Sequence, residues 1–276
     1  MIVFPNCKIN LGLRILRKRA DGFHDLETIF YPVPATDVLE VLLTSTNSEN
    51  ISFTQTGFPI TGPAESNSCI KAYQLLKSQY PSIKRLHVHL HKNIPTGAGL
   101  GGGSSDSVAM LQVVKDLCQL PLSQDELANY ALQLGSDCPF FLLNKPALAT
   151  GRGEVLNEIS LSLKGYHLLL INPGISVSTA EAFSGCVPNN AGKSLATIIQ
   201  APIETWKKEL HNQFEETVFL QHPVLNSIKN ELYESGAIYA SMSGSGSTLF
   251  GIFPGSTPTP HSLLKKFPWT RWLKLS

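Results

Sequence analysis

The residues with the clearest chemical potential lie at positions 95–106, PTGAGLGGGSSD, where five of twelve residues are glycine. Without Cβ atoms, the backbone N–H groups of such a loop can close on a ligand. The helical pattern that begins near Ser104 leaves N–H groups unpaired and a partial positive charge, which suits an anion such as phosphate. The hydroxyls of Ser104 and Ser105 could cap the helix, contact phosphate oxygens or touch a metal ion held by them. We therefore predict a phosphate-binding loop rather than a tight turn, which needs only one or two glycines.

Other glycine-rich phosphate loops fit this stretch less well. A G-x-G-x-x-G pattern begins at Gly97, but a dinucleotide-binding domain normally opens near its first strand and carries an acidic residue at the end of its second. Neither feature is present here. The loop is not that of a protein kinase, because valine does not follow it and no H-R-D or D-F-G occurs. Residues 192–194, GKS, imitate the end of a Walker A motif, but the required first glycine falls on Val187.

Polar residues that could serve a reaction also occur in a predicted strand and just after a predicted helix. Cys7, Ile9, Leu11 and Leu13 alternate with polar or small residues, so the sequence predicts a strand with Lys8 and Asn10 on the face opposite the apolar set. Asp137 follows Gly135, which we expect to end a helix as a left-handed cap. The pattern alone leaves open a solvated lysine on the strand and an aspartate that serves a turn or an N-cap.

The elements that must position these residues mix strands and helices without a strict βαβ rhythm, which predicts an α+β fold with two lobes. The Asp21-Gly22 turn favours a hairpin between the first two strands. We expect strands at 37–43, 51–53, 85–94 and 166–173, and helices at 67–77, 104–117, 179–183, 203–220, 224–235 and 261–273, with another opened by a capping box at Ser123. A small-residue loop at 241–247 precedes a last apolar run.

Composition excludes several classes of protein. The chain has 276 residues, 42% hydrophobic and 16% charged, which favours a packed core over disorder. A net charge of +1 with no basic patch argues against nucleic-acid binding. The five cysteines form no C-x-x-C pair, and the N-terminal residues lack a signal-peptide pattern, so we expect a reduced cytoplasmic protein without membrane spans. His87, His89 and His91 share one strand face, but we predict no metal site there.

Three segments together resemble a known family. PTGAGLGGGSSD resembles the second motif of the GHMP kinases, the superfamily of galactokinase, homoserine kinase and mevalonate kinase. SMSGSGSTLFGIF resembles the third motif. PNCKINLGLRILRKRADGFHDLETIF and GSDCPFF resemble the branch of this superfamily that phosphorylates 4-diphosphocytidyl-2-C-methyl-D-erythritol. The matches run in the family's order from about Pro5 to Phe253.

The resemblance implies a fold and a reaction. The expected fold is the two-lobed GHMP kinase fold, with an N-terminal domain at 1–158 like the second domain of ribosomal protein S5 and a ferredoxin-like domain at 159–276. The expected reaction transfers the γ-phosphoryl group of ATP, with Mg²⁺, to the 2-hydroxyl of the cytidine-diphosphate-linked methylerythritol. This is a step of the non-mevalonate route to isoprenoid precursors. The expected partners are small molecules, with no nucleic acid and no membrane, and the expected assembly is a monomer or a weak homodimer.

The resemblance also assigns residues. The catalytic pair falls on Lys8 and Asp137. The cytosine ring is expected between Phe23 and Phe183, with His24 at the edge of the base and Thr179 near the methylerythritol end. Asn10 is also expected to bind the substrate. The family often has tyrosine where Phe23 stands, so stacking is expected to be kept and a hydroxyl contact to be lost. ATP binding is assigned to Asn67 and to the loop residues Pro95, Thr96, Gly97, Ala98, Gly99, Leu100, Gly101, Gly102, Gly103, Ser104 and Ser105. No residue is assigned as a metal ligand.

Two alternatives stay open at this point. Another GHMP kinase, of the homoserine or mevalonate type, would share the glycine loop but not the segment around His24 or Phe183. A nucleotide-binding homologue that has lost catalysis would keep the fold, although the presence of both Lys8 and Asp137 argues against it.

Overall fold

The computed structural model describes residues 1–45 and 50–276, which form two compact units. The first unit comprises Met1–Cys7, Ala35–Thr96 and Gly101–Asn144. The second comprises Lys8–Pro34, Gly97–Leu100 and Lys145–Ser276. The mixed α+β class predicted from the sequence is confirmed, whereas the division at 158/159 concerns family domains and stays a prediction.

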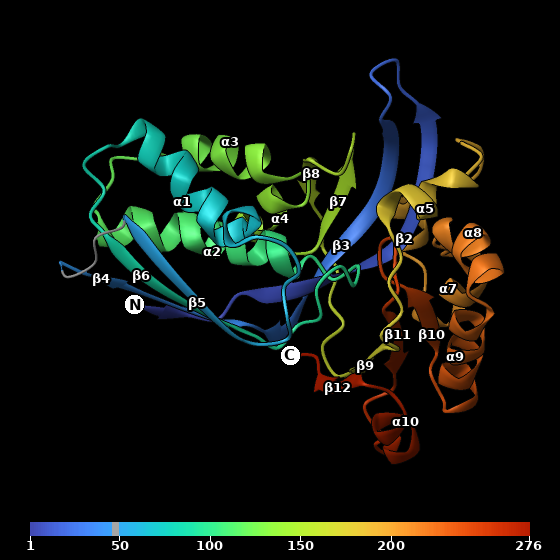
Figure 1. Cartoon of the computed structure of the whole chain (residues 1–276). Helices are drawn as coiled ribbons and strands as arrows, with labels where there is room; N and C mark the ends of the chain where they lie inside the picture. The colour runs from blue at the N-terminus through green and yellow to red at the C-terminus, as the bar shows by residue number, and fades with distance from the viewer. Residues whose placement is uncertain (46–49) are drawn as a thin grey trace. The chain divides into compact units, whose positions relative to one another are not determined.

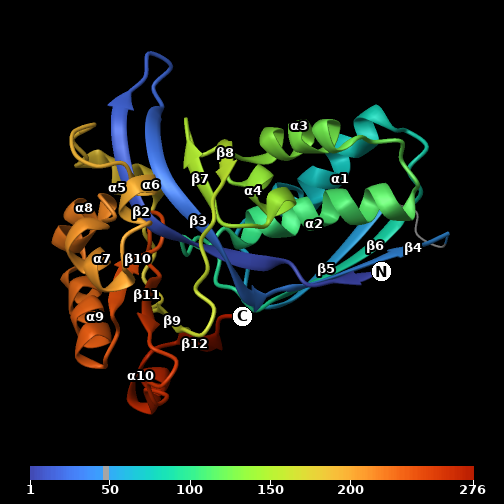
Figure 2. The same ribbon diagram turned by 180° about the vertical axis from the view of Figure 1, so that it is seen from behind.

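The first unit is a four-stranded sheet with helices on one face, as Figures 1 and 2 show. The strand order is β1-β4-β6-β5, in which β5 and β6 are parallel and the other pairs antiparallel. The elements are β1 (Ile2–Val3), β4 (Val38–Leu43), β5 (Ile51–Gly57), η1 (Ala64–Ser66), α1 (Ser68–Gln79), β6 (Leu86–Lys92), α2 (Gly102–Leu117), α3 (Gln124–Leu134) and α4 (Cys138–Leu143).

Local sequence explains these elements well. Strand β6 alternates buried Leu86, Val88 and Leu90 with half-buried histidines, as its period-two pattern predicts. The histidines are hydrogen-bonded to hydroxyls of β5, for example His87 Nδ1 to Ser52 Oγ at 2.8 Å. The capping box that opens α3 is present, since Ser123 Oγ accepts from the next turn and a glutamate reaches back. The apolar stripe of α2 then packs on α1 and closes the core.

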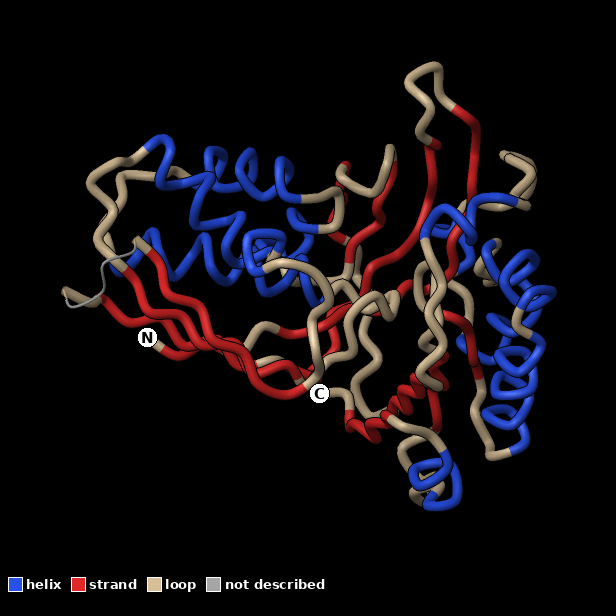
Figure 3. The backbone as a smooth tube through the Cα atoms, viewed as in Figure 1, coloured by secondary structure: helices blue, strands red, loops and turns tan. Residues whose placement is uncertain are grey.

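The second unit contains two further four-stranded sheets and the remaining helices, which Figure 3 distinguishes by colour. The sheets have orders β2-β3-β7-β8 and β10-β11-β9-β12, and the latter is antiparallel throughout. The elements are β2 (Asn6–Lys18), β3 (His24–Thr36), β7 (Ala147–Thr150), β8 (Val155–Glu158), β9 (His167–Asn172), α5 (Thr179–Ser184), α6 (Leu195–Ile198), α7 (Ile203–Glu209), α8 (Phe214–Gln221), α9 (Pro223–Glu234), β10 (Tyr239–Met242), β11 (Leu249–Phe253), α10 (His261–Lys266) and β12 (Trp269–Lys274).

Strand β2 contributes to the core of the second unit as well as to its polar site. Leu13 and Ile15 pack in one apolar cluster with side chains of β9, α8, α9 and β11, such as Leu169 and Leu225. Nearer the start of the same strand, Lys8 and Asn10 share one face, because side chains two residues apart point to the same side. The core therefore holds the strand that presents the predicted catalytic lysine.

Three expectations about elements were wrong. The helix expected at 203–220 is broken, because residues 211 and 213 exchange backbone hydrogen bonds with Leu13 of β2. The helix expected at 261–273 ends at Lys266, and after Pro268 the chain forms β12, which completes the sheet beside β9. Gly135 ends α3 with a φ of 167°, an extended conformation and not the left-handed cap.

No helix among residues 1–45 and 50–276 has the length and hydropathy needed to cross a bilayer.

Candidate active site

Three distant segments meet within the second unit: the start of β2, the loop residues 97–100 and the turn after β10. The backbone N–H of Lys8 donates to the carbonyl of Leu100 at 3.0 Å. Ser243 Oγ, which follows β10, donates to the carbonyl of Gly99 at 2.9 Å. The glycine loop is therefore fastened on one side to the predicted catalytic strand and on the other to the predicted third motif.

The close approach at Gly99 explains why this position is glycine. A Cβ built there would lie 2.0 Å from the carbonyl oxygen of Ser243, and the φ of +76° is also unfavourable for other residues. Gly97 and Gly101 have left-handed φ values of +63° and +69° as well, but a Cβ at Gly97 would meet nothing within 4 Å. The loop thus needs glycine for backbone conformation at several positions and for space at Gly99.

Lys8 and Asn10 form a buried polar pair on β2. Both are almost fully buried, and Lys8 Nζ donates to Asn10 Oδ1 at 2.6 Å and to the carbonyl of Gly99 at 3.3 Å. The same ammonium lies 4.8 Å from the ring centroid of Phe30. Asn10 Nδ2 donates to Thr28 Oγ1 at 2.9 Å, which fixes the amide with its oxygen toward the lysine. The charge of Lys8 is therefore held against the glycine loop.

Two residues that the sequence analysis missed hold the third motif. Asn212 Nδ2 donates to the carbonyls of Met242 and Gly244 at 2.7 and 2.8 Å. Glu215 Oε1 accepts from Ser241 Oγ and from the backbone N–H of Met242 at 3.0 and 2.7 Å. No sequence signal marked these side chains, because their partners lie about 30 residues away along the chain.

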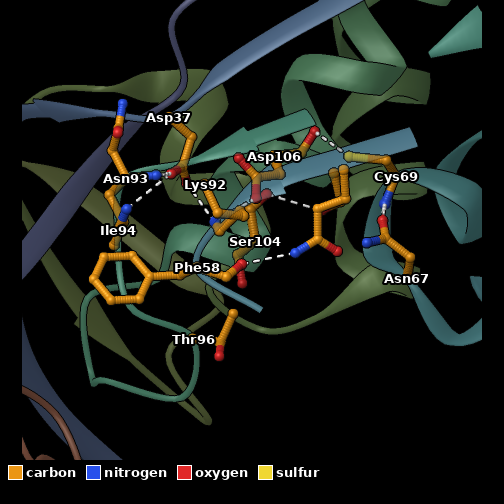
Figure 4. A network of polar contacts seen from close by, with 12 residues as sticks. Asp37, Phe58, Asn67, Cys69, Lys92, Asn93, Ile94, Thr96, Ser104 and Asp106 are labelled. Atoms are coloured by element: carbon orange, nitrogen blue, oxygen red, sulfur yellow. Dashed lines mark hydrogen bonds and ion pairs between the residues drawn. The ribbon is translucent and has the colours of Figure 1, made fainter. Parts of the chain in front are cut away.

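In the first unit, a buried ion network fixes the start of α2 against β6. Lys92 Nζ donates to carboxylate oxygens of both Asp37 and Asp106, and the second distance is 2.7 Å. Asp37 Oδ1 in turn accepts the backbone N–H groups of Asn93 and Ile94 at 2.6 and 2.9 Å. Figure 4 shows both carboxylates directed at the lysine, with Asp106 in the first turns of the helix. The sequence analysis did not predict this network.

The network brings one lysine and two carboxyl groups together in a buried place. Burial, opposed by Lys92, raises the pKa of Asp106 to about 7. Among the described residues, Asp106 Oδ1 has no hydrogen-bond partner. The same lysine explains Gly102, since a Cβ there would lie 3.3 Å from Lys92 Nζ and 3.1 Å from a side-chain carbon of Ile94. The start of α2 is thus held by ionic contacts and by close packing.

The other residues predicted in the first unit lie at helix starts. Asn67 is the N-cap of α1, and its Oδ1 accepts from the backbone N–H of Cys69 at 2.8 Å. Asp137 occupies the N-cap position of α4 and is half-buried. Ser107 Oγ lies 3.5 Å from Cys138 Sγ and links α2 to α4. Because Lys8 belongs to the second unit and Asp137 to the first, the catalytic pairing of these two residues stays a prediction.

The residues predicted to bind the nucleoside lie in the second unit. The His24 ring stacks on Phe183 with centroids 4.7 Å apart and an interplanar angle of 18°. Phe23 is 54% exposed and lies beside Arg152. Thr179, also exposed, is the first residue of α5. The structure thus brings His24 and Phe183 into direct contact, while the sandwich of a base between Phe23 and Phe183 stays a prediction.

No group of three or more histidine, cysteine, aspartate or glutamate side chains with a metal-binding arrangement occurs in the described part of the chain. Mg²⁺ is usually bound in proteins through one or two protein oxygens together with substrate phosphates. Hydroxyl oxygens of this kind are present in the first turn of α2, at Ser104 and Ser105.

Comparisons with known proteins agree with the order of these segments. Residues 67–145 match the family of GHMP kinases N terminal domain, and residues 195–259 match GHMP kinases C terminal. The chain is 50% identical over 257 residues to a 4-diphosphocytidyl-2-C-methyl-D-erythritol kinase of Parabacteroides distasonis, covering 93% of each chain. It is 48% identical to the protein of the same name from Bacteroides thetaiotaomicron, covering 95% of each.

Solved structures show the same fold. A crystal structure of 4-(cytidine 5'-diphospho)-2C-methyl-D-erythritol kinase matches with a TM-score of 0.84 and 29% identity, covering 99% of this chain and 98% of the other. Mevalonate kinase from Methanococcus jannaschii matches with a TM-score of 0.71 and 14% identity, covering 100% and 98% of the two chains. The second likeness concerns the fold alone.

Proposed function

The chain belongs to the 4-diphosphocytidyl-2-C-methyl-D-erythritol kinase family of the GHMP kinases, and on this premise we propose that it transfers the γ-phosphoryl group of ATP to the 2-hydroxyl of 4-diphosphocytidyl-2-C-methyl-D-erythritol. The product then continues along the non-mevalonate route to isoprenoid precursors. The observation that carries the proposal is the meeting of Lys8, Asn10, Gly99 and Ser243 in the second unit. It places a buried ammonium against the glycine loop.

Lys8 is the group we propose to stabilise the charge that develops on the transferred phosphoryl group. Phosphoryl transfer needs mainly positioning and charge neutralisation. The ammonium is pre-oriented by Asn10 and by the Gly99 carbonyl, so little reorganisation is needed during the reaction. Asp137 is proposed to accept the proton of the 2-hydroxyl as the acceptor oxygen forms its bond to phosphorus and the bond to the ADP oxygen breaks.

ATP is proposed to bind along residues 95–105 and at Asn67. The first turn of α2 supplies N–H groups for the phosphates, and the buried support from Lys92, Asp37 and Asp106 keeps that turn in place. Ser104 and Ser105 would supply hydroxyl oxygens to Mg²⁺ bound to the phosphates, and this ion would neutralise the phosphate charge.

The cytidine end is proposed to bind at Phe23, His24 and Phe183, with Thr179 and Asn10 toward the alcohol. Aromatic rings provide stacking surfaces for any base, so His24 would supply the preference for cytosine through hydrogen bonds.

The wider expectations remain part of the proposal. We place the functional domains at 1–158 and 159–276, the assembly as a monomer or weak homodimer, and the reaction in the cytoplasm. Five free thiols, at Cys7, Cys69, Cys118, Cys138 and Cys186, support a reducing environment. No role with nucleic acid or membranes is proposed.

The test is a phosphorylation assay with three acceptors: the cytidyl methylerythritol, homoserine and mevalonate. We expect turnover with the cytidyl methylerythritol alone, and this turnover should require both ATP and Mg²⁺. ³¹P NMR of the product identifies the phosphorylated compound. Asp137→Asn should lower kcat by about 10²- to 10⁴-fold with little change in ATP affinity. Asp125→Asn, at an exposed position in α3, is the matched control and should keep full turnover. Turnover of homoserine but not of the cytidyl compound would overturn the proposal.

A further inference from the structure

An arginine that none of the motifs includes lies against the exposed ring of Phe23. The guanidinium carbon of Arg152 lies 5.0 Å from the ring centroid, within cation–π range. Phe23 is 54% exposed, so much of its ring remains accessible to a ligand. One face of this ring is therefore occupied by a cation.

The turn between β7 and β8 fixes the position of Arg152. Its backbone N–H and its Nε donate to the two carboxylate oxygens of Glu154 at 2.5 and 3.5 Å. Gly151, directly before it, accepts the backbone N–H of Leu26 at 2.7 Å, which fastens the turn to β3. Both ends of the contact are thus anchored within the second unit, since Phe23 directly precedes β3.

The two aromatic rings proposed to bind the nucleoside are held in different ways. Phe183 is stacked on by His24 and packs edge-to-face on Phe214, with centroids 4.8 Å apart. The Phe23 ring, by contrast, has the Arg152 guanidinium over one face. A Phe23 ring that was not held would lose rotational freedom when a base stacked on it, which lowers affinity.

The other arginines of the β2–β3 hairpin are engaged with its own carboxylates. Arg17 pairs with Asp25, and Arg19 pairs with both Asp21 and Asp25 at 2.9 Å. Arg152 comes from a different hairpin; besides its pair with Glu154, its guanidinium lies over the Phe23 ring, and its side chain is still 35% exposed. Arg152 is therefore the cation that contacts the proposed nucleoside subsite.

We propose that Arg152 is a substrate-positioning residue, whose guanidinium holds one face of Phe23 so that the other face takes the pyrimidine base of the cytidine-diphosphate substrate. The inference rests on the proposed function for the identity of the substrate, but the binding step can be measured without turnover.

The experiment compares Arg152→Met and Arg152→Lys with the wild type. We expect Arg152→Met to raise KM for the cytidyl alcohol by about 3- to 30-fold, the range of a cation–π contact, while kcat and KM for ATP stay within about two-fold. Arg152→Lys keeps the cation and should recover part of the loss. Arg271→Met removes a matched guanidinium that lies 5.0 Å from the ring of Trp269 in β12, and should leave KM unchanged.

A double-mutant cycle separates a role through Phe23 from a general one. Phe23→Leu should weaken the binding of CDP, measured by calorimetry, and Arg152→Met should add little in that background. Full additivity, or an unchanged KM in Arg152→Met, would overturn the inference. If the protein does not phosphorylate the cytidyl alcohol but CDP binding shows the coupling, the proposed function fails and the inference holds.

Discussion

Asn10 Oδ1 accepts a hydrogen bond from Lys8 Nζ at 2.6 Å, with both side chains buried on the same face of β2. The amide of Asn10 is held in that orientation by its second bond, from Nδ2 to Thr28 Oγ1. A buried ammonium is costly unless it has good acceptors, so Asn10 both stabilises and aims the charge. The pair explains why an asparagine stands two residues after the predicted catalytic lysine.

Replacing Asn10 should therefore impair the proposed reaction through Lys8. We expect Asn10→Ala to lower kcat by about 10- to 100-fold, because the ammonium loses the contact that orients it. KM for ATP should change little. Asn157→Ala, at an exposed position in β8, removes the same group without such partners and should be neutral. Steady-state kinetics of both variants check this, and an Asn10→Ala enzyme with full kcat would contradict the role.

The glycines at 97 and 99 offer a matched pair that separates backbone conformation from space. Both have left-handed φ values, but a Cβ at Gly99 would overlap the carbonyl of Ser243, whereas one at Gly97 would meet nothing within 4 Å. We expect Gly97→Ala to reduce the free energy of unfolding by about 1 kcal/mol from backbone strain alone. Gly99→Ala should cost about 3 kcal/mol and raise KM for ATP, because the loop must leave the third motif.

Urea unfolding and ATP titration of the two variants test this difference. Equal losses in both would mean that the contact with Ser243 adds nothing to the conformational requirement. A larger loss in Gly97→Ala would contradict the assigned geometry altogether.

Local patterns predicted much of the fold, because strand alternation and helix caps depend on neighbouring residues. Strand β6 and the capping box of α3 appear where period-two spacing and Ser123 placed them. The broken helix at 203–220 could not be predicted in this way. The interruption comes from hydrogen bonds to Leu13, about 200 residues earlier, which no local propensity contains.

The polar supports of the candidate site were missed for the same reason. Lys92 and Asp37 are 55 residues apart in the sequence, and Asn212 and Gly244 are 32 apart. Each residue alone resembles an ordinary surface polar group. By contrast, β12 had a local signal that was overlooked, since Pro268 disfavours a continuous helix from 261 to 273.

The buried network in the first unit should make stability depend on pH through Asp106. Its pKa is raised from 3.8 to about 7, because burial disfavours a second carboxylate beside Asp37 when Lys92 supplies a single positive charge. Between these pH values the folded protein keeps a proton that the unfolded chain has released. The contribution of Asp106 to the free energy of unfolding is therefore complete below about pH 4 and is lost as the pH rises to about 7.

Asp106→Asn should remove this dependence. We expect the free energy of unfolding of the wild type, relative to this variant, to fall across pH 4.5 to 7 and then to stay level. Denaturant unfolding at several pH values measures the difference, in which the groups common to both proteins cancel. A difference that rises with pH over this range would show that Asp106 is stabilised as a carboxylate instead.

The third motif should depend on the buried carboxylate of Glu215. Its oxygens accept from Ser241 Oγ, the backbone N–H of Met242 and Lys229 Nζ, and removing the charge weakens all three bonds. We expect Glu215→Gln to lower the free energy of unfolding by about 2–3 kcal/mol, the value of hydrogen bonds to a charged group, and to raise KM for ATP because the turn that holds Gly99 loosens. Glu231→Gln breaks a mostly exposed pair with Lys266 in the same unit and should cost less than about 1 kcal/mol with no kinetic effect.

Urea unfolding and ATP kinetics of Glu215→Gln and Glu231→Gln test this difference. Equal small losses would mean that the turn keeps its place without the carboxylate.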